Sequence, residues 1–291
     1  METEEILSHY ARDCVQREIS RYSRGRWVAI HLNYGASPRM VRYRYADGAA
    51  LPLRIEERGD VERIVRAFGG RIRSFYATIH RYDWSGPRPS RILSSMPSWD
   101  IDLLVDEVEP ALKAAADLIS TLERYGVTKS IIVKWSGQGV HIHVNDQAFS
   151  PSLFEAWSPL DVAYAVTEFI MGRCGEHGSS VKVENKVDPG RVFTSPLSLH
   201  REVDRVCVCI PPDEVLSFAA EWASPKSFRH YLEWDGFEPG EADALAITAL
   251  ETIGPYTGKM KRKRLHPPLD YEIDRLLKRF GKGDACTTHR A

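Results

Sequence analysis

The 291-residue sequence is poor in cysteine and has no long apolar run. Five cysteines are few for this length and odd in number, which argues against a disulfide framework and indicates a reducing, cytoplasmic setting. No apolar stretch approaches the roughly 20 residues that span a bilayer, so we expect no membrane segment. The first residues, Met1-Glu2-Thr3-Glu4-Glu5, lack the basic start and apolar core of a signal peptide.

Net charge is also nearly absent. A formal charge of −1 argues against protein-wide electrostatic attraction to nucleic acid, but it leaves local attraction open. Each basic cluster is typical of a solvated face, yet their recurrence within the first 75 residues favours nucleic-acid binding. The clusters are Arg17, Arg21, Arg24 and Arg26; Arg39, Arg42 and Arg44; Arg63, Arg66, Arg71 and Arg73; and the run Lys259–Arg264.

Hydrophobic periodicity predicts an α/β (α+β) protein. Helical spacing covers residues 4–20, 60–68 (capped by Asp60), 109–125 and 159–171, and alternation predicts strands over residues 26–32, 40–45, 71–82, 130–135, 140–144, 181–184 and 206–210. The strand, helix and strand around residues 100–135 indicate a βαβ crossover or a split version of it. From residue 213 the pattern is helical, over residues 213–221, 227–232, 241–253 and 271–280. We therefore expect a core of residues 1–212 and a helical C-terminal region of residues 213–291.

Two aspartates stand two residues apart in the apolar stretch Trp99–Asp106. On a strand, Asp100 and Asp102 project from the same face. Two neighbouring buried carboxylates repel each other, and a divalent cation such as Mg²⁺ or Mn²⁺ relieves that repulsion. The alternative is an edge strand with two solvated aspartates. Asp106 is better placed as a helix cap than as a third ligand.

A glycine-bounded turn follows, in the segment Ser136-Gly137-Gln138-Gly139-Val140-His141. The two glycines allow a tight turn whose backbone N–H groups face an anion. A second serine and histidine segment, Ser195–His200, occurs further along. Acid pair, glycine turn and second segment together indicate phosphate and metal chemistry.

In this order the three segments resemble the catalytic core of the archaeo-eukaryotic primase superfamily, above all the small catalytic subunit of archaeal DNA primase and related primase-polymerases, over roughly residues 20–212. The resemblance implies mixed β-sheets flanked by helices. It implies a DNA-directed nucleotidyltransferase that makes primers in DNA replication, using two Mg²⁺ or Mn²⁺ ions. Asp100 and Asp102 would hold the ions. The residues implied to contact the nucleoside triphosphate are Ser136, Gly137, Gly139, His141, Ser198 and His200.

Three positions depart from the family pattern. Gln138 stands where an Arg or Lys is usual within the turn, and Thr194 stands where a basic residue commonly precedes Ser-Pro; Arg191 or Arg201 would supply the missing charge. Spacing back from His200 places the third metal-binding acid on Lys182. A short deletion in the turn makes Glu184 the candidate, and Asp188 is the second choice.

Zinc is not expected. Cys174 and His177 would have to meet Cys207 and Cys209, but the last two share one strand face, which is unusual for zinc ligands in a knuckle. Buried, unreactive cysteines are the preferred interpretation.

Three functions are consistent with these features of the sequence. The first is a primase or primase-polymerase that needs single-stranded DNA template and nucleoside triphosphates, and that works with or without a large primase subunit. The second is a weakened relative that binds nucleotide or single-stranded nucleic acid without catalysis. A metal-dependent nuclease or phosphatase is disfavoured, because no further acid or histidine cluster has hydrolase-like spacing. Side chains available to the template, none assigned individually, are Arg24, Arg26, Trp27, Arg71, Arg73, Tyr76, Arg81 and Tyr82.

Overall fold

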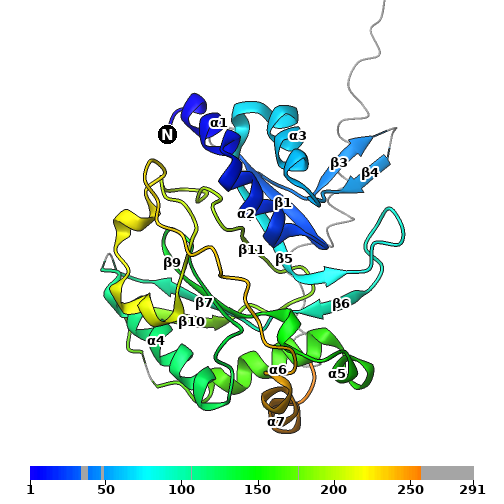
Figure 1. The fold of residues 1–291 in the computed structure, drawn as a ribbon, viewed down its shortest axis with the longest axis vertical. Coiled ribbons are helices and arrows are strands. Elements are labelled where there is room, and N and C mark those ends of the chain that lie inside the picture. The colour runs from blue at the N-terminus through cyan, green and yellow to red at the C-terminus, as the bar shows by residue number, and fades with distance from the viewer. Residues whose placement is uncertain (34–38, 47–48, 106, 176, 257–291) are drawn as a thin grey trace, which may run out of the picture. The chain divides into compact units, whose positions relative to one another are not determined.

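Two five-stranded sheets form the centre of the protein in a computed structural model (Figure 1). The structure describes residues 1–33, 39–46, 49–105, 107–175 and 177–256. Met1–Pro255 form one compact unit, and Tyr256–Ala291 form a second, of which only Tyr256 is described. The Lys259–Arg264 run, the helix predicted over residues 271–280 and the Asp106 cap lie outside the described residues.

The first sheet has the strand order β11-β5-β1-β2, with β6 also paired to β5. Its strands are β1 (Arg26–Leu32), β2 (Arg39–Val41), β5 (Ile72–Tyr82), β6 (Ile92–Ser95) and β11 (Val192–Thr194). The strands predicted over residues 26–32 and 71–82 are confirmed. The strand predicted over residues 40–45 is divided in two: β2 pairs with β1, whereas β3 (Tyr43–Ala46) pairs with β4 (Ala49–Pro52) in a separate ribbon.

The second sheet has the strand order β10-β7-β9-β8-β12. Its strands are β7 (Ser98–Leu103), β8 (Ile131–Trp135), β9 (Gly139–Val144), β10 (Val181–Asn185) and β12 (Val208–Ile210). Strand β9 pairs antiparallel with both β7 and β8, so β7 and β8 run parallel with β9 between them. The helix α4 (Glu109–Arg124) connects β7 to β8. This is the split form of the predicted crossover.

Alternation gives the second sheet one apolar and one polar face. Trp99 and Ile101 of β7 and Ile142 of β9 are completely buried on the apolar face. Helices α4 and α6 (Pro159–Met171) run beside this sheet (Figure 1), and Trp99 Nε1 donates to Thr167 O of α6 at 3.1 Å. The opposite face carries Asp100, Asp102 and their neighbours, so the core on one side positions the polar groups on the other. The short α5 (Pro151–Ala156) precedes α6.

The N-terminal helix predicted over residues 4–20 is two helices, α1 (Thr3–Ala11) and α2 (Asp13–Ser23). Arg12 is extended between them, where it donates to Pro225 O at 3.0 Å and stacks on Phe228. These distant contacts explain a break that local periodicity does not reveal.

The helix α3 (Arg58–Phe68) begins two residues earlier than predicted. Glu57 is its N-cap, and the side chains of Glu57 and Asp60 exchange the reciprocal hydrogen bonds of a capping box. Asp60 is therefore the third helical residue rather than the cap, and the short 3₁₀ turn η1 (Gly69–Arg71) follows. A second 3₁₀ turn, η2 (Asp146–Ala148), follows β9.

Residues 213–255 belong to the same compact unit as residues 1–212, so no boundary between compact units lies at residue 213. The helix predicted over residues 213–221 is two 3₁₀ segments, η3 (Pro212–Ser217) and η4 (Ala220–Ala223). The helix predicted over residues 241–253 is α7 (Asp243–Ile253), whose Leu245, Ala246 and Ala249 are buried in the common core. None of the described helices is long and apolar enough to cross a membrane.

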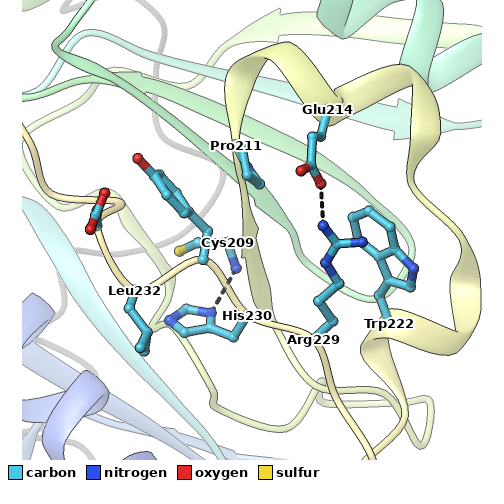
Figure 2. Close-up of a pocket in the computed structure, with 9 residues that line it drawn as sticks. Cys209, Pro211, Glu214, Trp222, Arg229, His230 and Leu232 are labelled. Carbon is cyan, nitrogen blue, oxygen red and sulfur yellow. Dashed lines mark hydrogen bonds and ion pairs between the residues drawn. The ribbon is translucent and has the colours of Figure 1, made fainter.

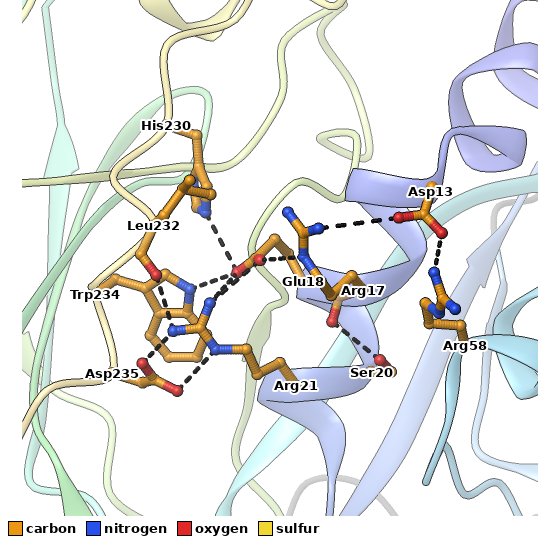
Figure 3. Close-up of polar contacts among 10 residues, drawn as sticks. All are labelled: Asp13, Arg17, Glu18, Ser20, Arg21, Arg58, His230, Leu232, Trp234 and Asp235. Atoms are coloured by element: carbon orange, nitrogen blue, oxygen red, sulfur yellow. Dashed lines mark hydrogen bonds and ion pairs between the residues drawn. The ribbon is translucent and has the colours of Figure 1, made fainter.

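The helix predicted over residues 227–232 is wrong, because its backbone bonds to distant strands and loops. Tyr231 N donates to Cys209 O at 3.0 Å. Figure 3 shows what anchors the next residues: the fully buried Glu18 of α2 accepts from Trp234 Nε1 at 2.7 Å, and Arg21 donates to Leu232 O at 2.8 Å. This buried polar cluster fastens the C-terminal segment to α2.

Candidate active site

One row of side chains crosses the polar face of the second sheet. Glu184 of β10 lies opposite Asp100 of β7, Asp100 lies opposite His141 of β9, and His141 lies opposite Lys134 of β8. Residues directly opposite each other project to the same face of a sheet. The strand order therefore brings together an acid pair, a histidine and the predicted third acid from three separate parts of the chain.

Asp100 lies between a histidine and a lysine. Its Oδ1 lies 3.3 Å from His141 Nε2 and its Oδ2 lies 3.9 Å from Lys186 Nζ. Burial raises the pKa of Asp100, but the hydrogen bond and charge of His141, with Lys186 and Arg191, outweigh burial and lower it overall. Asp100 is therefore ionised at neutral pH.

Asp102 lies one row along the same face, opposite Gly139 and Lys182. It makes no hydrogen bond or ion pair with any residue that the structure describes. Burial and the neighbouring charge of Asp100 raise its pKa. A cation bound between the two carboxylates would relieve the repulsion that raises the pKa of Asp102, and Mg²⁺ and Mn²⁺ bind carboxylate oxygens. Asp100 and Asp102 thus fit a divalent cation.

Glu184 reaches the row but is already ion-paired. Lys186 Nζ lies 2.6 Å from its Oε2 and Lys182 Nζ lies 3.1 Å from its Oε1. Burial raises the pKa of Glu184, and the two lysines outweigh burial and lower it. Across the described residues, no group of three His, Cys, Asp or Glu side chains has an arrangement that could hold a metal ion.

The second choice, Asp188, is not part of this row. Its carboxylate accepts from Gly190 N at 2.8 Å and from Arg191 Nη2 at 2.8 Å, which closes the turn between β10 and β11. The structure therefore gives Asp188 a role in the turn, in contrast to the predicted metal-ligand role.

The glycine turn closes β8 and β9. Ser136 N and Oγ both donate to Gly139 O, at 2.8 Å and 3.1 Å. A Cβ on Gly139 would lie 2.4 Å from Ile101 O of β7, so only glycine allows β9 to approach β7 here. The backbone N–H groups of Gly137 and Gln138 donate to no acceptor among the described residues, which leaves them available to an anion.

His200 packs directly on this turn. Gly137 has a φ of +121°, and a Cβ there would lie 2.8 Å from His200 Cβ. The Nδ1 of His200 accepts from Glu202 N and Val203 N, each at 3.2 Å, so this pattern assigns the proton to Nε2. Burial and the nearby Arg201 charge lower the pKa of His200 to about 4. His200 is thus a neutral donor beside the turn.

Contrary to the prediction, Ser198 does not reach the site. Its side chain is completely buried, and its Oγ accepts from Phe75 N at 2.8 Å and donates to Leu199 O at 3.1 Å. The hydroxyl of Ser198 is therefore bound to the first sheet, whereas His200 packs on the glycine turn. Arg201 is half-exposed and pairs with Glu202 at 3.1 Å.

Two residues of the site, Lys186 and Phe193, were not singled out from the sequence, and a third, Arg73, was expected to be available to the template. Lys186 joins Glu184 to Asp100, as described above. Phe193 of β11 packs edge-on against His141 and His143, with ring centroids 4.7 Å and 4.8 Å apart. Arg73 donates to His200 O at 2.8 Å and to Val203 O at 2.7 Å, which fixes the segment after His200. The alternation Lys182, Glu184, Lys186 was the one available sequence signal.

Two basic residues that the sequence made available to template are used internally. Arg26 is 2% exposed and pairs with the buried Asp146 at 2.6 Å. Arg73 is 4% exposed and bonds to the segment after His200. Arg81 also pairs with Asp146, at 2.8 Å. These contacts remove Arg26 and Arg73 from the set of side chains that were expected to be available to the template.

A separate pocket lies against β12 (Figure 2). Its lining includes Cys209, Trp222, Arg229 and His230 and none of the acid-row residues. Arg229 stacks over Trp222 at 4.0 Å and pairs with Glu214 at 2.6 Å. Because no residue of the acid row lines this pocket, it adds nothing to the chemistry of that row.

Comparison with solved structures identifies the architecture. The polymerase domain of Mycobacterium tuberculosis Ligase D, in complex with DNA, is similar to this chain with a TM-score of 0.53 and 12% sequence identity. The match covers 87% of this chain and 90% of that chain. This is a polymerase-domain fold. The predicted mixed α/β fold class is therefore confirmed. No family model matches the sequence, and no curated protein matches it, so membership of the primase superfamily stays a prediction.

Proposed function

We propose that this protein is a template-dependent nucleotidyltransferase of the primase-polymerase kind, which makes primers from nucleoside triphosphates. The observation that carries the proposal is the packing of Gly137 against His200, next to the row that holds Asp100 and His141. Two anion-binding elements and a cation-binding pair then face one substrate. The likeness to a polymerase domain that binds DNA supports the same function.

The acid pair provides the metal-binding part of the proposed site. Asp100 and Asp102 would bind Mg²⁺ or Mn²⁺, which offsets phosphate charge and favours ionisation of the attacking 3′-hydroxyl. His141 Nε2 orients Asp100 through their 3.3 Å contact. Asp100 stays ionised because His141 and Lys186 lower its pKa, so it needs no deprotonation before binding a cation.

Neutral donors provide the phosphate-binding part. The free N–H groups of Gly137 and Gln138 and the Nε2–H of His200 would donate to the triphosphate oxygens. In this proposal, Ser136 shapes the turn through its bonds to Gly139 O. Arg201 is sufficiently exposed to reach a phosphate. Single-stranded DNA and a large primase subunit are the proposed macromolecular partners.

Primer synthesis tests the proposal directly. The protein is incubated with single-stranded DNA, labelled nucleotides and Mg²⁺ or Mn²⁺, beside Asp100→Ala/Asp102→Ala and the exposed surface control Glu4→Ala/Glu123→Ala. We expect labelled oligomers from the wild type and the surface control and none from the acid-pair variant. Oligomers from the acid-pair variant would show that these carboxylates are not the catalytic ones.

A second function is favoured by a specific observation. Because Glu184 is bound by Lys182 and Lys186, a weakened relative that binds nucleotide or single-stranded nucleic acid as a non-enzymatic subunit fits the same geometry. Gln138 and Thr194, which replace basic residues of the family pattern, support it. Metal-dependent nucleotide binding without oligomer synthesis would favour this second function.

A further inference from the structure

The ammonium group of Lys186 lies between two carboxylates of the acid row. It is 2.6 Å from Glu184 Oε2 and 3.9 Å from Asp100 Oδ2, and its side chain is 22% exposed. Lys182 differs, because it is 58% exposed and, among the described residues, forms an ion pair with Glu184 alone, at 3.1 Å. Of these two lysines, Lys186 is therefore the one that joins the third acid to the acid pair.

This placement conflicts with an ion shared by Asp100 and Glu184. Such an ion would have to bind the same carboxylate oxygens that Lys186 contacts. Two cations within a few ångströms of each other repel strongly in a partly buried site. Asp102, in contrast, is unpaired among the described residues and has no lysine within ion-pair distance. This face of the sheet thus presents Asp102, which has no ion-pair partner among the described residues, beside Asp100, which already lies near Lys186.

We propose that Lys186 is a resident counter-cation that takes the place of a second divalent ion. The site then binds a single divalent ion, through Asp100 and Asp102, and Glu184 stays with its lysines. This inference rests on the proposed function for the identity of the cation, and it deepens it by assigning the ion number. Lys186 acts as a fixed positive charge at a position where the two-ion scheme needs a metal.

Manganese binding without substrate tests the inference. Free Mn²⁺ is measured by electron paramagnetic resonance during titration of the full chain. We expect one ion per wild-type chain and none with Asp102→Asn. Lys186→Met removes the charge and keeps the aliphatic stem, so a second ion should bind, roughly tenfold or more tighter than any second ion in the wild type. Lys186→Arg keeps the charge and should retain one ion.

Lys182→Met is the matched control, because it removes a lysine from Glu184 without touching Asp100. It should leave the stoichiometry at one. Thermal unfolding of each variant checks that it is folded. Two ions in the wild type, or one ion in a folded Lys186→Met, would overturn the inference, as would no bound ion in either protein. The same change from one to two ions without primer synthesis would instead reject the proposed polymerase activity and leave the role of Lys186 standing.

Discussion

Replacing Gly137 with alanine should separate the role of the glycine turn from that of the surrounding sheet. The residue has a φ of +121°, which side-chain-bearing residues rarely adopt, and its added Cβ would lie 2.8 Å from His200 Cβ and 2.9 Å from His200 Cγ. His200 cannot retreat freely, because Arg73 binds its carbonyl and two backbone N–H groups bind its Nδ1. Either the turn or His200 must move.

The magnitude follows from two terms. Backbone strain at a glycine-only conformation costs about 1–3 kcal/mol, and overpacking against a fixed neighbour costs about 1–3 kcal/mol. Relaxation of the turn will reduce their sum, so we expect a loss of about 2–4 kcal/mol in unfolding free energy. Nucleotide affinity should fall by about 10- to 100-fold, because displacing one donor to a charged phosphate costs about 1.5–3 kcal/mol.

Urea unfolding and titration with a fluorescent nucleoside triphosphate measure the two effects. Gly86→Ala is the matched control, since a Cβ there meets no atom within 4 Å and its φ is outside the positive region. The control should keep wild-type stability and affinity. A Gly137→Ala protein with nucleotide affinity within twofold of the wild type would refute the assignment of this turn to phosphate binding, whatever its stability.

Further predictions concern buried polar groups. Asp146→Asn should lower the free energy of unfolding, measured with a chemical denaturant, by about 3–5 kcal/mol, because it leaves Arg26 buried without its counter-charge. Asp13→Asn, at an exposed position, should lower it much less. Equal losses in the two variants would contradict this prediction. Burial raises the pKa of Asp146, but Arg26 and other partners lower it to about 2, below its ordinary 3.8. Its contribution to stability is thus present above pH 3.8 and lost as pH falls through about 2, so Asp146→Asn should flatten that part of the stability–pH curve. Ser198→Ala should lower the free energy of unfolding by about 1–3 kcal/mol, since it removes the acceptor of Phe75 N, but nucleotide affinity should stay within twofold of the wild type. A large loss of affinity without a loss of stability would show that Ser198 contacts the phosphates after all.

Hydrophobic alternation along the sequence predicted the structure correctly wherever a single strand determines which residues share a face. The alternation around Asp100 and Asp102 correctly predicted one strand face for both, and β1 and β5 were located within a residue. The order of acid pair, glycine turn and second histidine segment was sufficient to expect a mixed α/β core, which the likeness to a polymerase domain confirms. These features depend on backbone geometry and spacing, which the chain carries locally.

Long-range contacts decided the rest. Arg12 interrupts the N-terminal helix because it bonds to Pro225, and residues 227–232 are irregular because Tyr231 bonds to β12. Periodicity cannot predict a break whose cause lies some two hundred residues away. The same holds for Ser198, whose hydroxyl is taken by Phe75 N.

The amino-acid sequence established which chemistry is present: two carboxylates on one face, a glycine turn and a histidine segment. Only folding determined how their charges are neutralised, because the free energy of a buried charge depends on neighbours from other strands. Asp100 meets His141 and Lys186, Glu184 is bound by two lysines, and Asp102 is left unpaired among the described residues. That distribution of partners distinguishes a site for one divalent ion from a site for two.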